Sequence, residues 1–225
     1  EALCNRAPET FREAVQFLAH FQSVDRTYCG GGALGSLDTL LEEYFERDTA
    51  KGILTEEEAV WMIASLFFND THYTQIGGLT PAGDREVTSR LSFVILDAMH
   101  LLQIPTNLAV RVHAPVPGQT EEAEILLKRA VEYTLEDGSG VCYSLENGIS
   151  EGFSKNGFPL ELGRMRVKCG CNWVAIPGRE YPLQDVTRVN MAVALHYALE
   201  DLEAEGKYTT ERLWELFCTH LGIMV

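Results

Sequence analysis

The sequence predicts a helix-rich α/β fold, and three observations support this prediction. Most of the chain has apolar residues at helical spacing, the pattern of helices with one buried face. A few short segments between these helices read as strands. Apolar residues make up 46% of the 225 residues, enough to bury a sizeable core in one large domain or two small ones.

Two helices are expected in the first third of the chain. Residues 8–21 place Pro8 near a first helical turn, where proline is tolerated. Residues 54–68 begin with Thr55 and Glu58 at the spacing of a capping box. The residues expected on the apolar faces are Phe11, Ala14, Val15, Leu18 and Phe21 in the first helix, and Ala59, Ile63, Leu66 and Phe67 in the second.

The middle of the chain predicts a helix followed by a strand. Residues 84–103 have helical spacing, and this helix stops before Pro105 because the residue ahead of a proline avoids the helical conformation. Residues 106–114 then alternate, which predicts a strand. One side carries Leu108, Val110 and Val112, and the other carries Ala109, Arg111 and His113.

Two glycine-rich segments are expected to be loops. Residues 29–35 lack the preceding apolar strand and the Lys-Ser/Thr ending of a phosphate-binding loop, so a turn between helices is expected. Gly77 and Gly78 come shortly before a long helix. Five polar residues could face a substrate or, more commonly for such residues, lie at the surface or in a hydrogen-bonded core: His72, Tyr73, Gln75, Arg111 and His113.

The last part of the chain predicts one short strand and several helices. A helix over residues 121–138 should end at Gly138, because glycine favours the left-handed conformation that closes helices. The final helix should begin at Thr209 or Thr210 and end at Gly222. The other expected elements are a strand at 141–144, a short helix within 158–167 and a long helix within 184–206.

The charge and the cysteines narrow the class of protein. The formal net charge of −15 disfavours binding to nucleic acid or to an anionic membrane. No stretch approaches the roughly 20 apolar residues that a membrane span requires. Six cysteines without a disulfide-framework spacing indicate reduced thiols and a cytoplasmic location, and an anaerobic setting would suit them. They are Cys4, Cys29, Cys142, Cys169, Cys171 and Cys218.

The segment VKCGCNWVAIPG holds two cysteines separated by one glycine, Cys169 and Cys171. Structural zinc sites usually space a first ligand pair two to four residues apart and add a second pair, so no metal is expected. A redox pair is disfavoured because no thioredoxin-like βαβ pattern surrounds the segment. A third interpretation, a loop that presents one thiol to a substrate, stays open beside these two.

Five segments, in order, resemble the glycyl radical enzymes, whose best-known members are pyruvate formate-lyase and the glycerol and choline lyases. The segments are PETFREAVQFLAHF, LGSLDTLLEEYFERDTAKGILTEEEA, TQIGGLTPAGDREVTSRLSFVILDAMHLLQIPTNLAVRVH, LEDGSGVCYSLENGI and CGCNW. The resemblance implies that residues 1–225 are the central part of a ten-stranded α/β barrel made of two half-barrels wrapped by helices. The family's radical-bearing motif, Arg-Val-x-Gly-Tyr, does not occur in this sequence. Because the sequence starts at Glu1 without a methionine and ends in an apolar run, we expect a segment of a longer chain.

The resemblance also implies a mechanism. A stable glycyl radical, installed by a partner that uses S-adenosylmethionine and an iron–sulfur cluster, oxidises a cysteine to a thiyl radical. The thiyl radical removes a hydrogen atom from a small metabolite under anaerobic conditions, and a carbon–carbon or carbon–heteroatom bond is then cleaved or formed. No other cofactor is expected, and the full-length form is expected to be a homodimer. The alternative is a non-catalytic homologue that kept the fold as a binding scaffold.

The resemblance assigns roles to individual residues. Cys171 matches the thiyl cysteine of the family. The lyases and dehydratases of the family carry an acid/base glutamate two residues later, where this chain has Trp173. Glu180 is the candidate to replace that glutamate, with Asp185 as a second choice. Trp173, His72 and Arg179 are candidates to contact the substrate, whereas Cys169 is expected to be a small buried residue.

Overall fold

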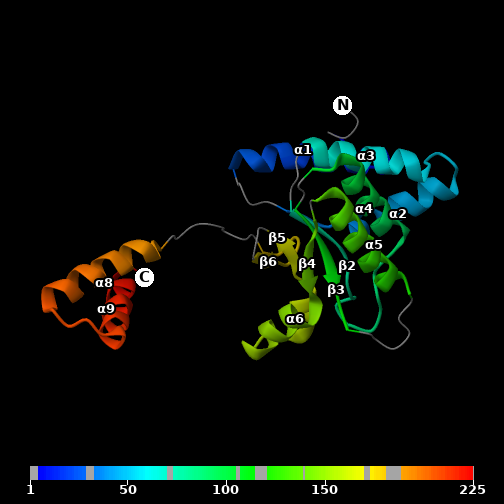
Figure 1. Cartoon of the computed structure of the whole chain (residues 1–225). Coiled ribbons are helices and arrows are strands. Elements are labelled where there is room, and N and C mark those ends of the chain that lie inside the picture. The colour runs from blue at the N-terminus through cyan, green and yellow to red at the C-terminus, as the bar shows by residue number, and fades with distance from the viewer. Residues whose placement is uncertain are drawn as a thin grey trace. The chain divides into compact units, whose positions relative to one another are not determined.

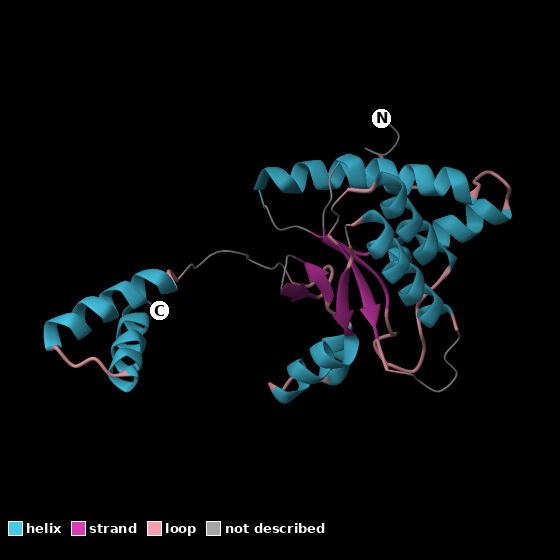
Figure 2. Ribbon diagram, in the orientation of Figure 1, coloured by secondary structure: helices cyan, strands magenta, loops and turns pink. Residues whose placement is uncertain are grey.

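The computed structural model describes residues 5–28, 33–69, 73–104, 107–114, 121–138, 140–169, 173–180 and 189–224. The chain forms two compact units, Glu1–Pro182 and Leu183–Val225. Both units are visible in Figures 1 and 2, and each is described by itself. The first unit combines helices with a parallel sheet, which confirms the predicted helix-rich α/β class.

The sheet of the first unit has four parallel strands in chain order. They are β1 (Ala33–Ser36), β2 (Tyr73–Gly77), β3 (Leu108–Val112) and β4 (Cys142–Leu145). The helices of the same unit are α1 (Phe11–Tyr28), α2 (Leu37–Ala50), α3 (Glu56–Asn69), α4 (Arg90–Leu102), α5 (Glu122–Asp137), α6 (Glu146–Lys155) and α7 (Leu160–Arg164). Helices α2 to α5 lie to one side of the strands in Figure 1. Parallel neighbours need such helical crossovers, because a tight turn can join only antiparallel strands.

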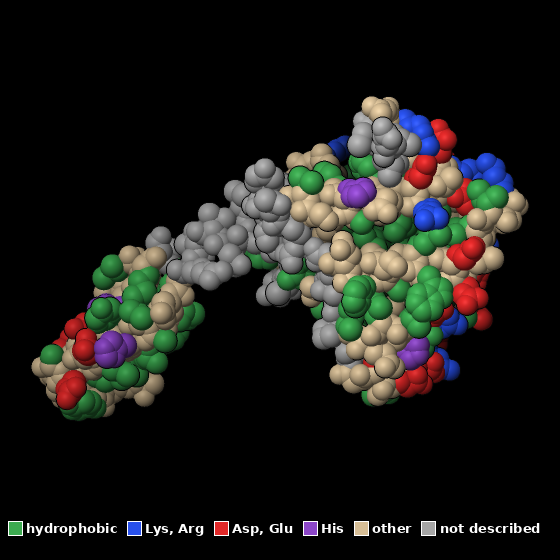
Figure 3. All heavy atoms as spheres, turned by 90° about the horizontal axis from the view of Figure 1, so that it is seen from above, with side chains coloured by type: hydrophobic (Ala, Val, Ile, Leu, Met, Phe, Trp, Pro, Cys, Tyr) green, Lys and Arg blue, Asp and Glu red, His purple; other side chains and the backbone are tan. Residues whose placement is uncertain are grey.

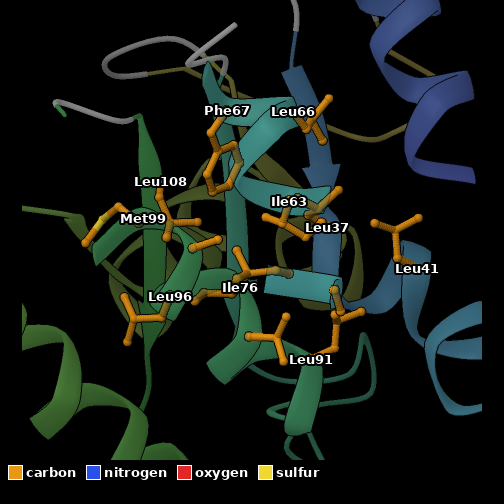
Figure 4. Packing of buried hydrophobic residues seen from close by; sticks show 14 of the residues in the cluster. Leu37, Leu41, Ile63, Leu66, Phe67, Ile76, Leu91, Leu96, Met99 and Leu108 are labelled. Carbon is orange, nitrogen blue, oxygen red and sulfur yellow. The ribbon is translucent and has the colours of Figure 1, made fainter. Parts of the chain in front are cut away.

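The main core lies between the sheet and these helices. Ile76 of β2 and Leu108 of β3 have no exposed surface and belong to the same cluster as Leu37, Ile63 and Leu96 of the helices. Figure 4 shows these side chains meeting in the space between strands and helices. The interior strands β2 and β3 are buried along almost their whole length, as strands of parallel sheets usually are, whereas three of the four residues of the edge strand β4 are exposed.

Two segments expected to be loops are strands. β1 falls within the glycine-rich segment 29–35, and β2 contains Gln75 and ends at Gly77. Short strands that are buried on both faces lack the alternation that reveals a strand in sequence, and glycine disguises them further. The loop prediction was therefore wrong where these two strands lie, and β2 is an interior strand between β1 and β3. From Gly78 to Ser89 the chain does form loops and turns before α4, as expected.

The helix ends agree with the sequence in most places. The capping box of α3 is confirmed, because the Thr55 N–H donates to Glu58 Oε2 at 2.8 Å and the Glu58 N–H donates to Thr55 Oγ1 at 3.2 Å. α5 ends at Gly138 with φ of 65°. α4 begins at Arg90, later than expected, because the preceding segment forms a turn closed by a bridge between Leu79 and Glu86.

Three further expectations about helices need correction. Phe21 was placed on the buried face of α1, but its side chain is 60% exposed. The final helix continues past Gly222, because a single glycine lowers helix stability without ending a helix. Helix α6 follows β4 directly and was not predicted, because glycine and serine at Gly148, Ser150 and Gly152 weaken its helical signal.

The second unit is a pair of helices, α8 (Met191–Glu205) and α9 (Thr210–Met224). Asn190 caps α8 by accepting a hydrogen bond from the Val193 N–H at 3.2 Å. The predicted cap of α9 is confirmed at Thr209, whose hydroxyl accepts from the Arg212 N–H at 3.1 Å. Ala198, Leu202 and Leu216 form the small core between the two helices.

Charged and apolar groups are mixed on the surface of the first unit. Figure 3 shows acidic and basic side chains interspersed along one edge, with apolar side chains among them. None of the described helices has the length and the apolar character needed to cross a membrane. Within the described ranges, no group of three His, Cys, Asp or Glu side chains is arranged to hold a metal ion.

Candidate thiol-bearing hairpin

The candidate site is a short antiparallel hairpin made of β5 (Val167–Cys169) and β6 (Trp173–Ala175). Its outermost described pair is Cys169 opposite Trp173. The connection between these two residues is 170–172, which contains Cys171 and lies outside the described residues. His72 also lies outside them. The structure therefore describes the two strands that lead to and from the candidate thiol.

The environment of Cys169 is dry. The residue is 2% exposed, which confirms the expectation of a small buried residue. Burial raises the pKa of its thiol to about 11, and the negative charge of Glu180 adds to this effect. A thiol with such a pKa is neutral at physiological pH, so this end of β5 favours S–H groups over thiolates.

The hairpin lies against the face of the sheet that is opposite α2 to α5, as Figure 1 shows. Two hydrogen bonds join them. The Lys168 N–H donates to Gln75 Oε1 at 2.9 Å, and Arg111 Nη1 donates to the carbonyl oxygen of Arg166 at 2.8 Å. One bond uses the backbone of β5 itself, and the other uses the residue directly before β5. The sheet therefore fixes the position of β5, both its distance from the sheet and its placement along the strands.

Gln75 and Arg111 are buried in a hydrogen-bonded network. Arg111 Nη1 also donates to Gln75 Oε1 at 3.1 Å, and Arg111 Nη2 pairs with Glu146 Oε2. The side chains of Arg111 and Glu146 are 1% and 2% exposed. Gln75 and Arg111 are thus part of a hydrogen-bonded core, and both also line a second hollow of about 510 Å³.

The turn after β6 is tight and is centred on Pro177 and Gly178. Gly178 has φ of 72°, and the Arg179 N–H donates to the Ile176 carbonyl oxygen at 3.1 Å. Proline followed by glycine at the centre of such a turn is the usual combination when the second position needs positive φ. Pro177 and Gly178 therefore end the hairpin sharply. Arg179 itself is exposed on this turn.

Glu180 accepts hydrogen bonds from residues at the base of the hairpin. Its Oε1 accepts from Arg166 Nη2 at 2.7 Å, and its Oε2 accepts from the Ile176 N–H at 3.0 Å. Both carboxylate oxygens therefore hold the two ends of the hairpin together. An acid/base role for Glu180 stays a prediction, and it would require the release of at least one of these bonds.

A hollow of about 590 Å³ lies beside the hairpin. Trp173, half of whose surface is exposed, forms part of its wall. The guanidinium of Arg166 packs over the ring of Phe153, with 4.1 Å between its central carbon and the ring centroid. The wall is largely apolar with a few polar groups, a composition typical of small-molecule sites. It is lined by Ser144, Ile149, Gly152, Phe153, Asn156, Phe158, Lys168, Trp173 and Val174.

The sequence did not reveal this hollow or the contact between Gln75 and Lys168. Helix α6 supplies much of the wall, and it was absent from the prediction. Gln75 and Lys168 are 93 residues apart. A weak signal was present, because Gln75 precedes the two glycines that were noted, although they were assigned to a loop.

A parallel sheet covered by helices on one face, with the hairpin of β5 and β6 against the other, agrees with the expected part of a glycyl radical enzyme barrel. Residues 1–209 match the family model described as pyruvate formate lyase-like. The chain therefore belongs to the pyruvate formate lyase-like family.

Two relatives match the chain in sequence. The chain is 26% identical to isethionate sulfite-lyase of Nitratidesulfovibrio vulgaris, over 88% of this chain and 26% of the relative. It is 32% identical to the glycyl radical subunit of 4-hydroxyphenylacetate decarboxylase of Clostridioides difficile, over 28% of this chain and 7% of the relative. The chain thus spans about a quarter of the sulfite-lyase.

Solved structures share the fold. A protein studied for 1,2-propanediol dehydration in Roseburia inulinivorans superposes with a TM-score of 0.77 at 23% identity, over 94% of this chain and 30% of that one. A glycyl radical enzyme from Archaeoglobus fulgidus gives a TM-score of 0.72 at 24% identity, over 85% and 27%. The predicted fold, a part of the glycyl radical enzyme barrel, is confirmed.

Proposed function

We propose that this chain is the central part of a glycyl radical enzyme and that Cys171 is its hydrogen-abstracting thiol. The observation that supports this best is the hairpin fixed on the sheet, with Cys169 buried at its outermost described pair. Residues 170–172 alone join the paired ends Cys169 and Trp173, so a thiol at 171 is tethered on both sides to fixed backbone. Hydrogen-atom transfer needs such placement, because the reacting atoms must approach closely.

The surroundings suit a thiol that acts as a radical. When the thiyl radical of Cys171 abstracts a hydrogen atom, an S–H bond forms, a substrate C–H bond breaks homolytically, and the unpaired electron moves to the substrate carbon. No net charge is created, so a dry and neutral environment costs this step little. A thiolate would need solvation or a nearby cation instead. The raised pKa of the neighbouring Cys169 thiol supports this assignment.

We propose that the reaction cleaves or forms a carbon–carbon or carbon–heteroatom bond. Relatives named as a sulfite-lyase, a decarboxylase and a glycerol dehydratase support the proposal that the complete protein is an enzyme of lyase type. Trp173 occupies the position at which the family's eliminating enzymes have a glutamate, and both oxygens of Glu180 are bonded. This favours a substrate whose reaction needs no carboxylic acid at that position. The apolar wall beside Trp173 favours a substrate with an apolar or aromatic part.

The radical would come from outside these residues. We propose that a glycyl radical, installed by a radical S-adenosylmethionine enzyme, supplies the unpaired electron. The complete protein would be an anaerobic, cytoplasmic homodimer with a small-molecule substrate. In this arrangement, residues 1–225 supply the thiol and part of the pocket wall, with Trp173, His72 and Arg179 as candidates to contact the substrate.

This proposal is tested on the complete open reading frame. We expect it to encode Arg-Val-x-Gly-Tyr after residue 225, beside a gene for an activating enzyme. Anaerobic activation of the complete protein should give an organic radical signal in electron paramagnetic resonance. A panel of isethionate, 4-hydroxyphenylacetate, 1,2-propanediol and glycerol would then test substrate class. If the intact gene locus lacks this motif, the proposed enzymatic function would be contradicted and the alternative, a binding scaffold, would be favoured.

A second candidate function, a non-catalytic scaffold, has one observation in its favour. Trp173 replaces the acid/base glutamate of the family's eliminating enzymes. The scaffold predicts that replacing Cys171 by alanine changes nothing that can be measured beyond stability. The enzyme predicts that the same change abolishes turnover while the protein still folds.

A further inference from the structure

We infer that Gln75 is a positioning residue that holds the thiol-bearing hairpin on the sheet, and this inference rests on the proposed function of Cys171. Its amide connects three separate parts of the fold. Oε1 accepts from the Lys168 N–H at 2.9 Å and from Arg111 Nη1 at 3.1 Å, and Nε2 donates to Ser36 Oγ at 2.8 Å. This one buried amide thereby provides a hydrogen-bond partner for three polar groups.

The position of Gln75 in the sheet makes it effective. It lies on β2, an interior strand between β1 and β3, and its residue is 4% exposed. Its neighbour Ile76 points into the helical core, so Gln75 points to the face that carries the hairpin. A side chain fixed by its own strand and by Ser36 is a rigid acceptor for a backbone N–H.

The bonded N–H belongs to the strand that enters the candidate loop. Lys168 is the middle residue of β5, one position before Cys169. β5 is only three residues long and pairs with a strand of the same length. An isolated hairpin of this size is unstable in water. Its position must therefore come from contacts with the sheet, of which the Gln75 bond is one and the Arg111–Arg166 bond is another.

Loss of the Gln75 carbonyl would remove an acceptor from two donors. The Lys168 N–H would lose its acceptor, and Arg111 Nη1 would retain only the carbonyl of Arg166. Such losses raise the population of locally opened states without unfolding the whole domain. The expected result is a hairpin that detaches more often, with a displaced thiol.

Cys169 reports this detachment. Its thiol is buried, so a thiol reagent reaches it only when the hairpin opens. The measurement uses N-ethylmaleimide on the 225-residue chain in a Cys171→Ser background. Trypsin cuts after Lys168 and Arg179, so the peptide 169–179 then contains a single thiol. The exposed Cys142 serves as an internal reference for reagent activity.

Replacement of Gln75 by leucine is expected to raise the labelling rate of Cys169, relative to Cys142, by about tenfold. The matched control is Thr74→Val, on the same strand. Thr74 is buried and donates to the Gly35 carbonyl at 2.8 Å, a bond within the sheet that does not involve the hairpin. The labelling rate of Cys169 in Thr74→Val should stay within about twofold of the rate in the unchanged chain, because this variant keeps the hydrogen bond between the Lys168 N–H and Gln75. Gln75→Glu keeps acceptor oxygens at this position, so the labelling rate of Cys169 in this variant should be close to that in the unchanged chain.

The result that would overturn the inference is equal labelling of Cys169 in Gln75→Leu and Thr74→Val. Labelling in Gln75→Glu as fast as in Gln75→Leu would equally overturn it, because the acceptor would then be irrelevant. Amide exchange over α4 checks the core in the same samples. If amide exchange shows that Gln75→Leu also opens α4, the milder variant Gln75→Asn is used instead. The labelling rate of Cys169 relative to Cys142 then decides whether the inference holds. None of these outcomes depends on whether Cys171 carries a radical, so failure here leaves the proposed function separately testable.

Discussion

Asp38 shows at the scale of one residue how the fold uses a buried carboxylate. Its Oδ2 accepts from the Gly77 N–H at 2.7 Å and from Ser92 Oγ at 2.6 Å, and its Oδ1 accepts from the Thr39 N–H at 2.8 Å. The side chain thus joins the first turn of α2, the end of β2 and the first turn of α4. Burial nevertheless raises its pKa from 3.8 to about 6, because these bonds offset only part of the cost of burying charge.

The raised pKa of Asp38 gives a pH-dependent stability. The folded state binds this proton more tightly than the unfolded state, so the free energy of unfolding falls as the pH rises from about 4 to about 6 and stays lower above that. Between pH 5 and pH 7 the loss from this residue should be about 1 kcal/mol. Urea unfolding of the unchanged chain and of Asp38→Asn, at both pH values, measures it.

Asn at position 38 does not titrate, so its variant lacks this contribution. The difference in unfolding free energy between the unchanged chain and Asp38→Asn should therefore shrink as the pH rises. Asn also places an N–H₂ where a carboxylate oxygen accepted, which costs about 1–3 kcal/mol at either pH. A difference that stays constant from pH 5 to pH 7 would show that Asp38 does not titrate in this range.

The N-terminus of α3 illustrates stability at the scale of an element. Thr55 and Glu58 satisfy each other's backbone N–H groups. Thr55→Ala removes the hydroxyl acceptor of the Glu58 N–H and should lower the free energy of unfolding by about 1 kcal/mol. Chemical denaturation measures this change in the free energy of unfolding, and the m-value should stay unchanged.

Thr49 provides a matched control for the capping prediction. Its hydroxyl donates to the Phe45 carbonyl at 2.8 Å, which lies inside α2 and already takes part in the helix. Thr49→Ala should therefore be close to neutral, because alanine has the higher helix propensity and no orphan group is left. Equal destabilisation by the two substitutions would contradict the role of the cap.

Long helices were the part of the fold that the sequence predicted best. In α3, the four residues expected to be buried are all buried, since a 3.6-residue period over many turns leaves little ambiguity. β1 and β2 were missed because they are short, contain or adjoin glycine and are buried on both faces. Secondary structure of this kind is decided by tertiary contacts that no local pattern contains.

At the scale of the whole molecule, the family resemblance predicted what local patterns did not. Motifs in the correct order indicated the barrel and pointed to one of the two cysteines, Cys171, whereas spacing alone left several interpretations open. The contacts that hold the hairpin could not be predicted. Gln75 and Lys168 are 93 residues apart, and Arg166 and Arg111 are 55 apart, so only the folded chain brings them together.

The most direct test of the account replaces Cys171 by alanine in the complete, anaerobically activated protein, with Cys169→Ala as the matched control. Both variants should fold and acquire the same organic radical signal per subunit, because neither change removes the site at which the radical is installed. The account predicts that Cys171→Ala abolishes substrate turnover, whereas Cys169→Ala retains it. Turnover that survives in Cys171→Ala, or that is lost only in Cys169→Ala, would contradict the assignment of Cys171 as the hydrogen-abstracting thiol.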